Sequence, residues 1–165
     1  MKTLLLMRHA KSSWKDPDLT DHERPLNKRG KRDAPLMGEL LKSEGLVPDV
    51  IYCSTAKRAR KTIGAVIEST GYTGKIEYMD TLYMAEPYAL IDILKSLPRK
   101  IDMVMLVGHN PGLEGVLQIL SGEIEALQTS AVAQIKLKIK QWDELDGDSP
   151  GKLINLWRAR ELRKA

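Results

Sequence analysis

The feature that most constrains the fold of this chain is the apolar run at residues 4–7, which leads directly into Arg8 and His9. The run is too short for a buried helix and has the length of a buried strand. Ligands of an open α/β sheet bind beyond the carboxyl ends of its strands. Arg8 and His9 therefore stand where a ligand is expected, and residues elsewhere that meet His9 would complete a site.

A second unit with the same layout lies at residues 49–53, an apolar strand-like run followed by Ser54. Serine is favoured at a helix N-cap, and an apolar stripe with helical spacing continues to Gly71. We therefore expect Ser54 to cap a helix. Arg58 then falls on its first turn, from which its guanidinium group can turn back toward the strand ends.

A third unit begins with residues 102–107, the most apolar run of the chain and therefore the expected central strand. It leads into His109, with Asn110 as the expected helix cap and Pro111 as the expected first helical residue. A second histidine is thus expected at a second strand end, immediately before a helix.

Periodicity and turn residues indicate the other elements of the chain. In chain order these are a long loop at 11–27, a helix at 28–43 stopped by Gly45, a strand at 75–79, a helix opened by Glu86 and Pro87, and a hairpin of 130–139 and 153–157 around a turn at 146–151. Together they predict an α/β fold. We expect a single domain over residues 1–165, with three α/β/α layers and a mixed, mostly parallel sheet flanked by helices on both faces.

Composition argues against several classes of partner. The net charge is +4, but basic residues alternate with acids along most of the chain. The chain has no Phe and only three Trp, which leaves no aromatic stacking platform for single-stranded nucleic acid. The apolar run before Arg8 is too short for a signal peptide or a membrane span. The single cysteine, Cys53, lies in an apolar run and suits a reducing compartment. We expect a monomeric cytoplasmic protein without nucleic-acid or membrane partners.

The predicted strand ends gather two imidazoles, His9 and His109, with the guanidinium groups of Arg8 and Arg58 near helix N-termini. This set suits a tetrahedral oxyanion with several negative charges, which indicates phosphate. A neutral His9 can attack phosphorus while the other groups hold the phosphoryl oxygens, and neighbouring cations favour its neutral form. The alternative is a strand-end histidine with a purely structural role. For His22, in the polar loop, the structural role is preferred.

Metal and nucleotide chemistry are not indicated. The chain has three histidines and no pair at His-x-x-Glu spacing, so recognisable zinc or two-metal ligand sets are missing from the sequence. It also has no glycine-rich loop followed by Lys-Ser or Lys-Thr, which argues against a nucleotide hydrolase. We expect no cofactor.

These residues resemble the histidine phosphatase superfamily, which includes phosphoglycerate mutases and many phosphatases. The resemblance rests on three motifs in order: Arg8-His9-Ala10, Ser54-x-x-x-Arg58-Ala59-x-x-Thr62, and Gly108-His109-Asn110-Pro111. Arg24-Pro25-Leu26-Asn27-x-x-Gly30 and Thr129-Ser130-Ala131 point to the SixA-type phosphohistidine phosphatase branch. The resemblance spans essentially the whole chain and implies a phosphoglycerate mutase-like fold.

The resemblance implies that His9 is the phosphorylated nucleophile and that Arg8, Arg58 and His109 form the phosphate pocket. Arg24 is implied as a further phosphate contact. The sequence departs from the family pattern at Ala10, where many members carry Gly, and at Lys15, where mutases carry Asn. The second departure weakens the case for a mutase.

Three further residues are candidates beside these motifs. Ser12 and Asn110 are expected to bind substrate. Glu86 is the acid available as proton donor, although an acidic residue at the start of a helix also has a structural explanation. A leaving imidazole needs little acid assistance, whereas an alkyl phosphate ester needs much more.

The function expected from the sequence is a metal-independent phosphatase that acts through a phosphohistidine intermediate on His9. The preferred substrate is a protein that carries phosphohistidine. Two alternatives remain open: a small-molecule phosphomonoesterase of the same superfamily, and a phosphoprotein-binding module without turnover.

Overall fold

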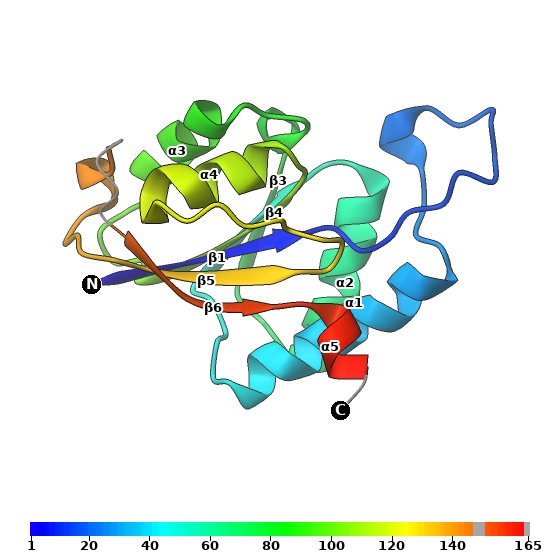
Figure 1. Cartoon of the computed structure of the whole chain (residues 1–165), viewed down its shortest axis with the longest axis horizontal. Coiled ribbons are helices and arrows are strands. Elements are labelled where there is room, and N and C mark those ends of the chain that lie inside the picture. Colours follow the sequence, from blue (N-terminus) through cyan, green and yellow to red (C-terminus); the bar gives the residue numbers. More distant parts are fainter. Residues whose placement is uncertain (147–150, 164–165) are drawn as a thin grey trace.

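A computed structural model describes residues 1–146 and 151–163, and it is built around a six-stranded sheet (Figure 1). The strand order is β3-β2-β4-β1-β5-β6. The strands are β1 (Lys2–Arg8), β2 (Val50–Ser54), β3 (Lys75–Met79), β4 (Met103–Gly108), β5 (Val132–Leu137) and β6 (Gly151–Trp157). The first four run parallel to one another, while β5 and β6 are antiparallel additions at one side. The predicted mixed, mostly parallel sheet is confirmed.

Helices cover both faces of this sheet, as predicted (Figure 1). The helices of one face are α1 (Lys28–Ser43), α2 (Lys57–Thr70) and α5 (Ala159–Arg163), and those of the other are α3 (Pro87–Lys95) and α4 (Gly112–Ser121). Leu4 and Leu6 pack toward α3 and α4, while Leu5 and Met7 pack toward α1 and α2. A strand covered on both faces is apolar at every position, which explains the continuous run of β1. Among the described residues, no helix has the length and apolar character that a membrane span requires.

The central strands bring the residues that follow β1, β2 and β4 to one edge of the sheet. β4 lies between β2 and β1, as expected for its apolar sequence. Arg8 pairs in register with Gly108, and Cys53 with Val107. Because these strands are parallel, the residues that follow them emerge side by side at the carboxyl edge.

The loop at residues 11–27 extends beyond this edge and returns to α1 (Figure 1). It contains one 3-10 turn, η1 (Asp21–Glu23), and a single β-bridge between Ser12 and Leu26. Asn27 caps α1 by accepting a hydrogen bond of 2.9 Å from the Gly30 amide. A Cβ on residue 30 would overlap the Lys11 carbonyl, so Gly30 is what allows α1 to pack against the loop.

Both expected helix caps are wrong, because their side chains have other partners. Ser54 is the last residue of β2, and α2 begins three residues later without a side-chain cap. Asn110 donates to the Leu127 carbonyl at 2.7 Å, and α4 begins after Pro111 rather than at it.

The C-terminal hairpin is confirmed, with different limits. β5 is shorter than the expected 130–139, partly because Ser130 has a left-handed backbone with φ of 68°. β6 begins at Gly151, two residues earlier than expected. Residues 147–150 of the expected turn lie outside the described residues.

Candidate active site

A cavity of about 320 Å³ lies at the carboxyl edge of the sheet. It is lined by Arg8, His9, Lys11, Ser12, Trp14, Asp21, Arg24, Arg58, Met84, His109, Asn110 and Thr129. The structure therefore brings together every candidate residue from the sequence except Glu86. Glu86 instead lines a neighbouring cavity together with Pro87, Pro111 and Glu114.

His9 follows β1 and is 6% exposed. Its Nδ1 lies 2.8 Å from the Ala10 carbonyl oxygen. A carbonyl only accepts hydrogen bonds, so Nδ1 carries the proton and Nε2 keeps its lone pair. Burial, together with repulsion from His109 and Arg58, lowers the pKa of His9 to about 3, although the bond to Ala10 opposes this shift. At neutral pH His9 is thus an uncharged imidazole whose Nε2 carries no proton.

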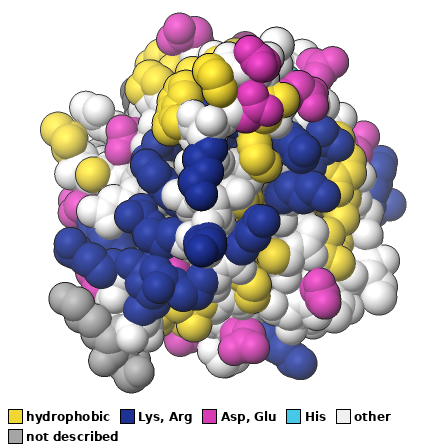
Figure 2. Space-filling view, turned by 90° about the vertical axis from the view of Figure 1, so that its right-hand side faces the viewer, with side chains coloured by type: hydrophobic (Ala, Val, Ile, Leu, Met, Phe, Trp, Pro, Cys, Tyr) yellow, Lys and Arg dark blue, Asp and Glu magenta, His cyan; other side chains and the backbone are white. Residues whose placement is uncertain are grey.

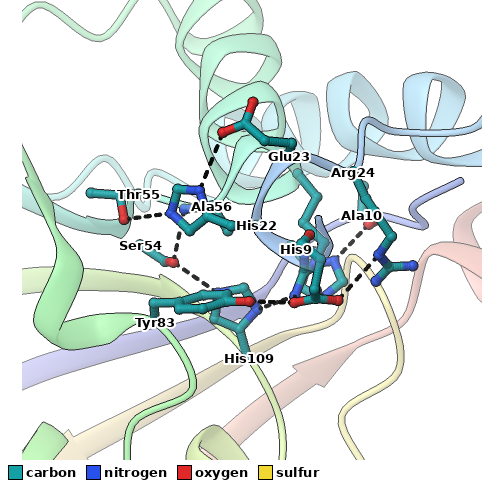
Figure 3. Close-up of polar contacts among 12 residues, drawn as sticks. His9, Ala10, His22, Glu23, Arg24, Ser54, Thr55, Ala56, Tyr83 and His109 are labelled. Atoms are coloured by element: carbon teal, nitrogen blue, oxygen red, sulfur yellow. Dashed lines mark hydrogen bonds and ion pairs between the residues drawn. The ribbon is translucent and has the colours of Figure 1, made fainter. Parts of the chain in front are cut away.

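His109 follows β4, and its ring centre lies 5.2 Å from that of His9. Its Nε2 is 2.8 Å from the Ser54 hydroxyl (Figure 3), and its Nδ1 is 3.5 Å from Arg58 Nη2. The Ser54 oxygen also accepts from the Ala56 amide at 3.2 Å. Ser54 therefore positions the His109 ring rather than capping a helix. Burial and the Arg58 charge lower the pKa of His109 to about 4.

Arg58 is the group that links the two imidazoles. It projects from the first turn of α2, is 3% exposed, and directs Nε toward His9 Nε2 at 3.4 Å. Its Nη1 donates to the Asp21 carbonyl at 2.7 Å, and its Nη2 to the Asp21 carboxylate at 3.0 Å. One fixed guanidinium group thus contacts both histidines and the loop.

Asp21 is the main residue of this cavity that the sequence did not reveal. Its carboxylate accepts from Arg58, from Arg24 Nε at 3.2 Å, and from the Tyr83 hydroxyl. Burial pushes the pKa of Asp21 upward, but the hydrogen bonds from Tyr83 and Arg58 outweigh it and hold the pKa at about 2. An internal carboxylate therefore occupies the guanidinium groups that a phosphate would use.

Two aromatic side chains, Tyr83 and Trp14, contact residues of the site. The Tyr83 ring meets the rings of His109 and His22 edge to face, at 5.4 and 4.9 Å between centres. His22 also bonds the Thr55 hydroxyl at 2.9 Å (Figure 3). The Arg24 guanidinium carbon lies 3.4 Å from the centre of the exposed Trp14 ring. Tyr83 and Trp14 have no periodic signal in the sequence that could have identified them.

Two guanidinium donors of the cavity are buried without a hydrogen-bond partner among the described residues, Arg8 Nε and Arg24 Nη1. Burial also lowers the pKa of Arg8. Buried donors are normally satisfied, so unpaired ones in a cavity indicate a place for an anionic ligand. Over the same described residues, no group of three or more His, Cys, Asp or Glu side chains is placed to hold a metal ion.

This chain is similar in sequence to known proteins. The family model of the histidine phosphatase superfamily, branch 1, matches residues 4–83. An uncharacterized chloroplast protein of Arabidopsis thaliana is 33% identical over 168 residues, which cover 94% of this chain and 77% of the relative.

Solved structures are similar to this chain over nearly its whole length. The candidate phosphohistidine phosphatase SixA of Agrobacterium tumefaciens has a TM-score of 0.83 and 28% identity, covering 95% of this chain and 97% of that one. The protein histidine phosphatase SixA complexed with tungstate also has a TM-score of 0.83, at 21% identity, covering 97% and 99% of the two chains. The chain belongs to the histidine phosphatase superfamily. Within that superfamily it is of the SixA type, with the phosphoglycerate mutase-like fold.

Proposed function

We propose that the protein is a metal-independent phosphatase that removes phosphate from phosphohistidine on a protein, through a phosphoryl group carried on His9. The observation that supports this most is the neutral His9 Nε2, 3.4 Å from Arg58 in a buried cavity that also holds His109. A nucleophile, a second imidazole and fixed cations are the groups that phosphoryl transfer requires.

In the first step His9 Nε2 attacks phosphorus, and a P–N bond forms as the bond to the leaving group breaks. Arg8, Arg58 and His109 hold the phosphoryl oxygens, with Arg24 as a further contact. The positive charge that develops on the His9 ring is shared with the Ala10 carbonyl through Nδ1–H. In the second step water attacks phosphorus and the P–N bond breaks. The electron pair returns to His9 Nε2, which restores the neutral imidazole, and the phosphate leaves with both protons of the water.

Ser12 and Asn110 complete the proposed substrate contacts, since both line the same cavity. The Asn110 amide is fixed by the Leu127 carbonyl, and its buried Oδ1 has no hydrogen-bond partner among the described residues. Asn110 therefore offers an acceptor to a substrate N–H, while the Ser12 hydroxyl offers a donor to an oxygen.

The placement of the acids favours phosphohistidine over an alkyl phosphate. Glu86, the proposed donor for an ester, lines the neighbouring cavity rather than that of His9. Asp21 lies closer, but with a pKa of about 2 it is ionised and holds no proton at neutral pH. A leaving imidazole needs little help from an acid, so this site suits a phosphoramidate substrate.

The proposal is tested by comparing hydrolysis of a phosphohistidine peptide and of a sugar phosphate by wild type and Glu86→Gln. We expect the peptide to be preferred, and the substitution to leave its hydrolysis unchanged, because Glu86 lies outside the cavity of His9. Glu123→Gln, an exposed acid on the loop after α4, serves as the matched control. An equal loss on both substrates, or a preference for the sugar phosphate, would contradict the proposal.

The cellular setting proposed here is that of a cytoplasmic monomer without nucleic-acid partners. The free thiol of Cys53, which is buried, suits a reducing compartment. Measuring the release of inorganic phosphate would also distinguish an enzyme from the alternative, a phosphoprotein-binding module. A binding module would retain the phosphoprotein without releasing phosphate.

A further inference from the structure

A second cavity, of about 360 Å³, lies beside the cavity around His9 and His109, which is here called the catalytic cavity after its proposed function. The two cavities share Arg8, Lys11 and Thr129 in their linings. The outer part of the second cavity is formed by Arg29 from α1 and by Arg160 and Arg163 from α5. This part of the surface, here called the basic cavity, is therefore continuous with the proposed phosphoryl site.

The basic cavity carries a large excess of positive charge. Its lining contains the four arginines already named and Lys11, against a single acid, Asp33. Figure 2 shows Lys and Arg side chains gathered across this face of the molecule. Like charges repel one another, so such a group is most stable when an anion joins it.

The Asp33 carboxylate does not neutralise the excess positive charge of the basic cavity. Asp33 is 1% exposed and forms ion pairs with Arg163, with Arg32 at 3.4 Å and with Arg29 at 3.9 Å. A single carboxylate balances only one of these cations. Among the described residues, neither Lys11 nor Arg160 takes part in an ion pair.

The cations of the basic cavity are also placed differently from those of the catalytic cavity. The Arg29 side chain is 49% exposed, although its Nη2 donates to Thr129 at 3.1 Å. Arg160 is exposed on the short C-terminal helix. Long, half-exposed side chains spread over α1 and α5 suit carboxylates that arrive on a protein surface, rather than one small ligand enclosed on all sides.

We propose that the basic cavity is a second anion subsite, which binds acidic side chains flanking the phosphorylated residue of a protein substrate. This inference rests on the proposed function. The shared residue Arg8 joins the two cavities, so a carboxylate a few residues from the phosphoryl group can reach Arg29 and Arg160 while the phosphoryl group faces His9. The subsite would lower KM for acidic substrates and leave the phosphoryl-transfer step unchanged.

The test compares two phosphohistidine peptides that differ only in flanking Glu or Gln residues, with wild type and Arg29→Gln/Arg160→Gln. We expect the double variant to lose roughly fivefold to tenfold in kcat/KM on the Glu peptide, through KM, with little change on the Gln peptide. Added salt should slow wild type on the Glu peptide and remove most of the difference between the peptides.

Arg99→Gln is the matched control, because Arg99 is exposed and its carbonyl accepts a hydrogen bond from Lys2, at the opposite end of β1. Thermal unfolding of all variants checks that they fold. An equal loss on both peptides, or none on either, overturns the subsite. A larger loss on a sugar bisphosphate than on the Glu peptide overturns it in favour of a small ligand, and competition by a single-stranded oligonucleotide overturns it in favour of nucleic acid.

The same experiment separates the two proposals. If wild type hydrolyses neither peptide, the proposed function is wrong, and the inference is overturned with it. If wild type hydrolyses both at the same rate, only the inference is wrong.

Discussion

The catalytic cavity and the basic cavity share lining residues, but their arginines differ in how far they are exposed to solvent. In the catalytic cavity, Arg58 and Arg24 are 3% and 7% exposed, and both are fixed by the Asp21 carboxylate. In the basic cavity, Arg29 and Arg160 reach toward solvent. Both cavities are rich in arginine, but Arg29 and Arg160 of the basic cavity are far more exposed than Arg58 and Arg24 of the catalytic cavity.

This difference in exposure indicates that the buried arginines act in the phosphoryl-transfer step and that the exposed arginines act in substrate binding. Buried charges that are already oriented stabilise a transition state strongly, because little reorganisation is needed during the reaction. Exposed charges on flexible side chains are screened by salt and act mainly on encounter and affinity. Substitutions in the catalytic cavity should therefore change turnover, and substitutions in the basic cavity should change KM.

The largest effect is expected from Arg58→Ala, which removes the group that links both histidines. We expect kcat to fall by roughly 10²- to 10³-fold, the usual cost of losing one preorganised donor to a developing charge. Arg60→Ala, on the exposed side of the same helix, should change kcat little. Steady-state kinetics on a phosphohistidine peptide measure both. A loss confined to KM would erase the contrast between the two cavities.

The positions of the two histidines of the cavity could be predicted because their signals are local. Each histidine follows an apolar run, and the carboxyl ends of parallel strands meet at one edge of the sheet. The proximity of His9, Arg58 and His109 could therefore be predicted. The same reasoning predicted the sheet and the central position of β4, and the structure confirms both. The distances among these side chains depend on the packing of α2 and α4, which periodicity does not give.

The residues that the sequence missed act through long-range contacts. Asp21 lies in a loop without periodicity, and only the fold brings it to Arg58 and Tyr83. The cap expected at Ser54 was wrong for a related reason: its hydroxyl bonds His109, which lies 55 positions away in the chain. Local propensity cannot anticipate a partner that far along the sequence.

A second prediction concerns pH, because the catalytic cavity buries neutral imidazoles. The pKa of His9 is about 3 in the folded chain, below its ordinary value of 6.5, so the unfolded chain binds more protons between these values. Stability should therefore fall as the pH is lowered from about 6.5.

Urea unfolding of wild type and His9→Gln at several pH values between 7 and 4.5 measures this effect. The wild-type slope should be steeper, by up to about 1.4 kcal/mol per pH unit for one proton. His109→Gln should also reduce the slope, because the pKa of His109 is about 4. Parallel curves for wild type and His9→Gln would show that His9 is not held neutral by burial.

The smallest effect is expected from Asp21→Asn, which removes the internal competitor for the phosphate site. Without that charge, Arg58 and Arg24 are free to bind phosphate, so the inhibition constant of inorganic phosphate should fall by roughly threefold to tenfold. Asp18→Asn in the same loop is the control. Weaker phosphate inhibition, or a collapse of turnover on phosphohistidine, would instead identify Asp21 as a group that the reaction needs.

The most direct test of the account is to trap the phosphorylated enzyme. Rapid quenching in alkali after mixing with a phosphohistidine peptide should capture an acid-labile, alkali-stable phosphoryl group, which mass spectrometry should locate on His9. His9→Gln should capture none. Wild type that releases phosphate with no phosphoryl group on His9, or with one on another residue, would contradict the central claim.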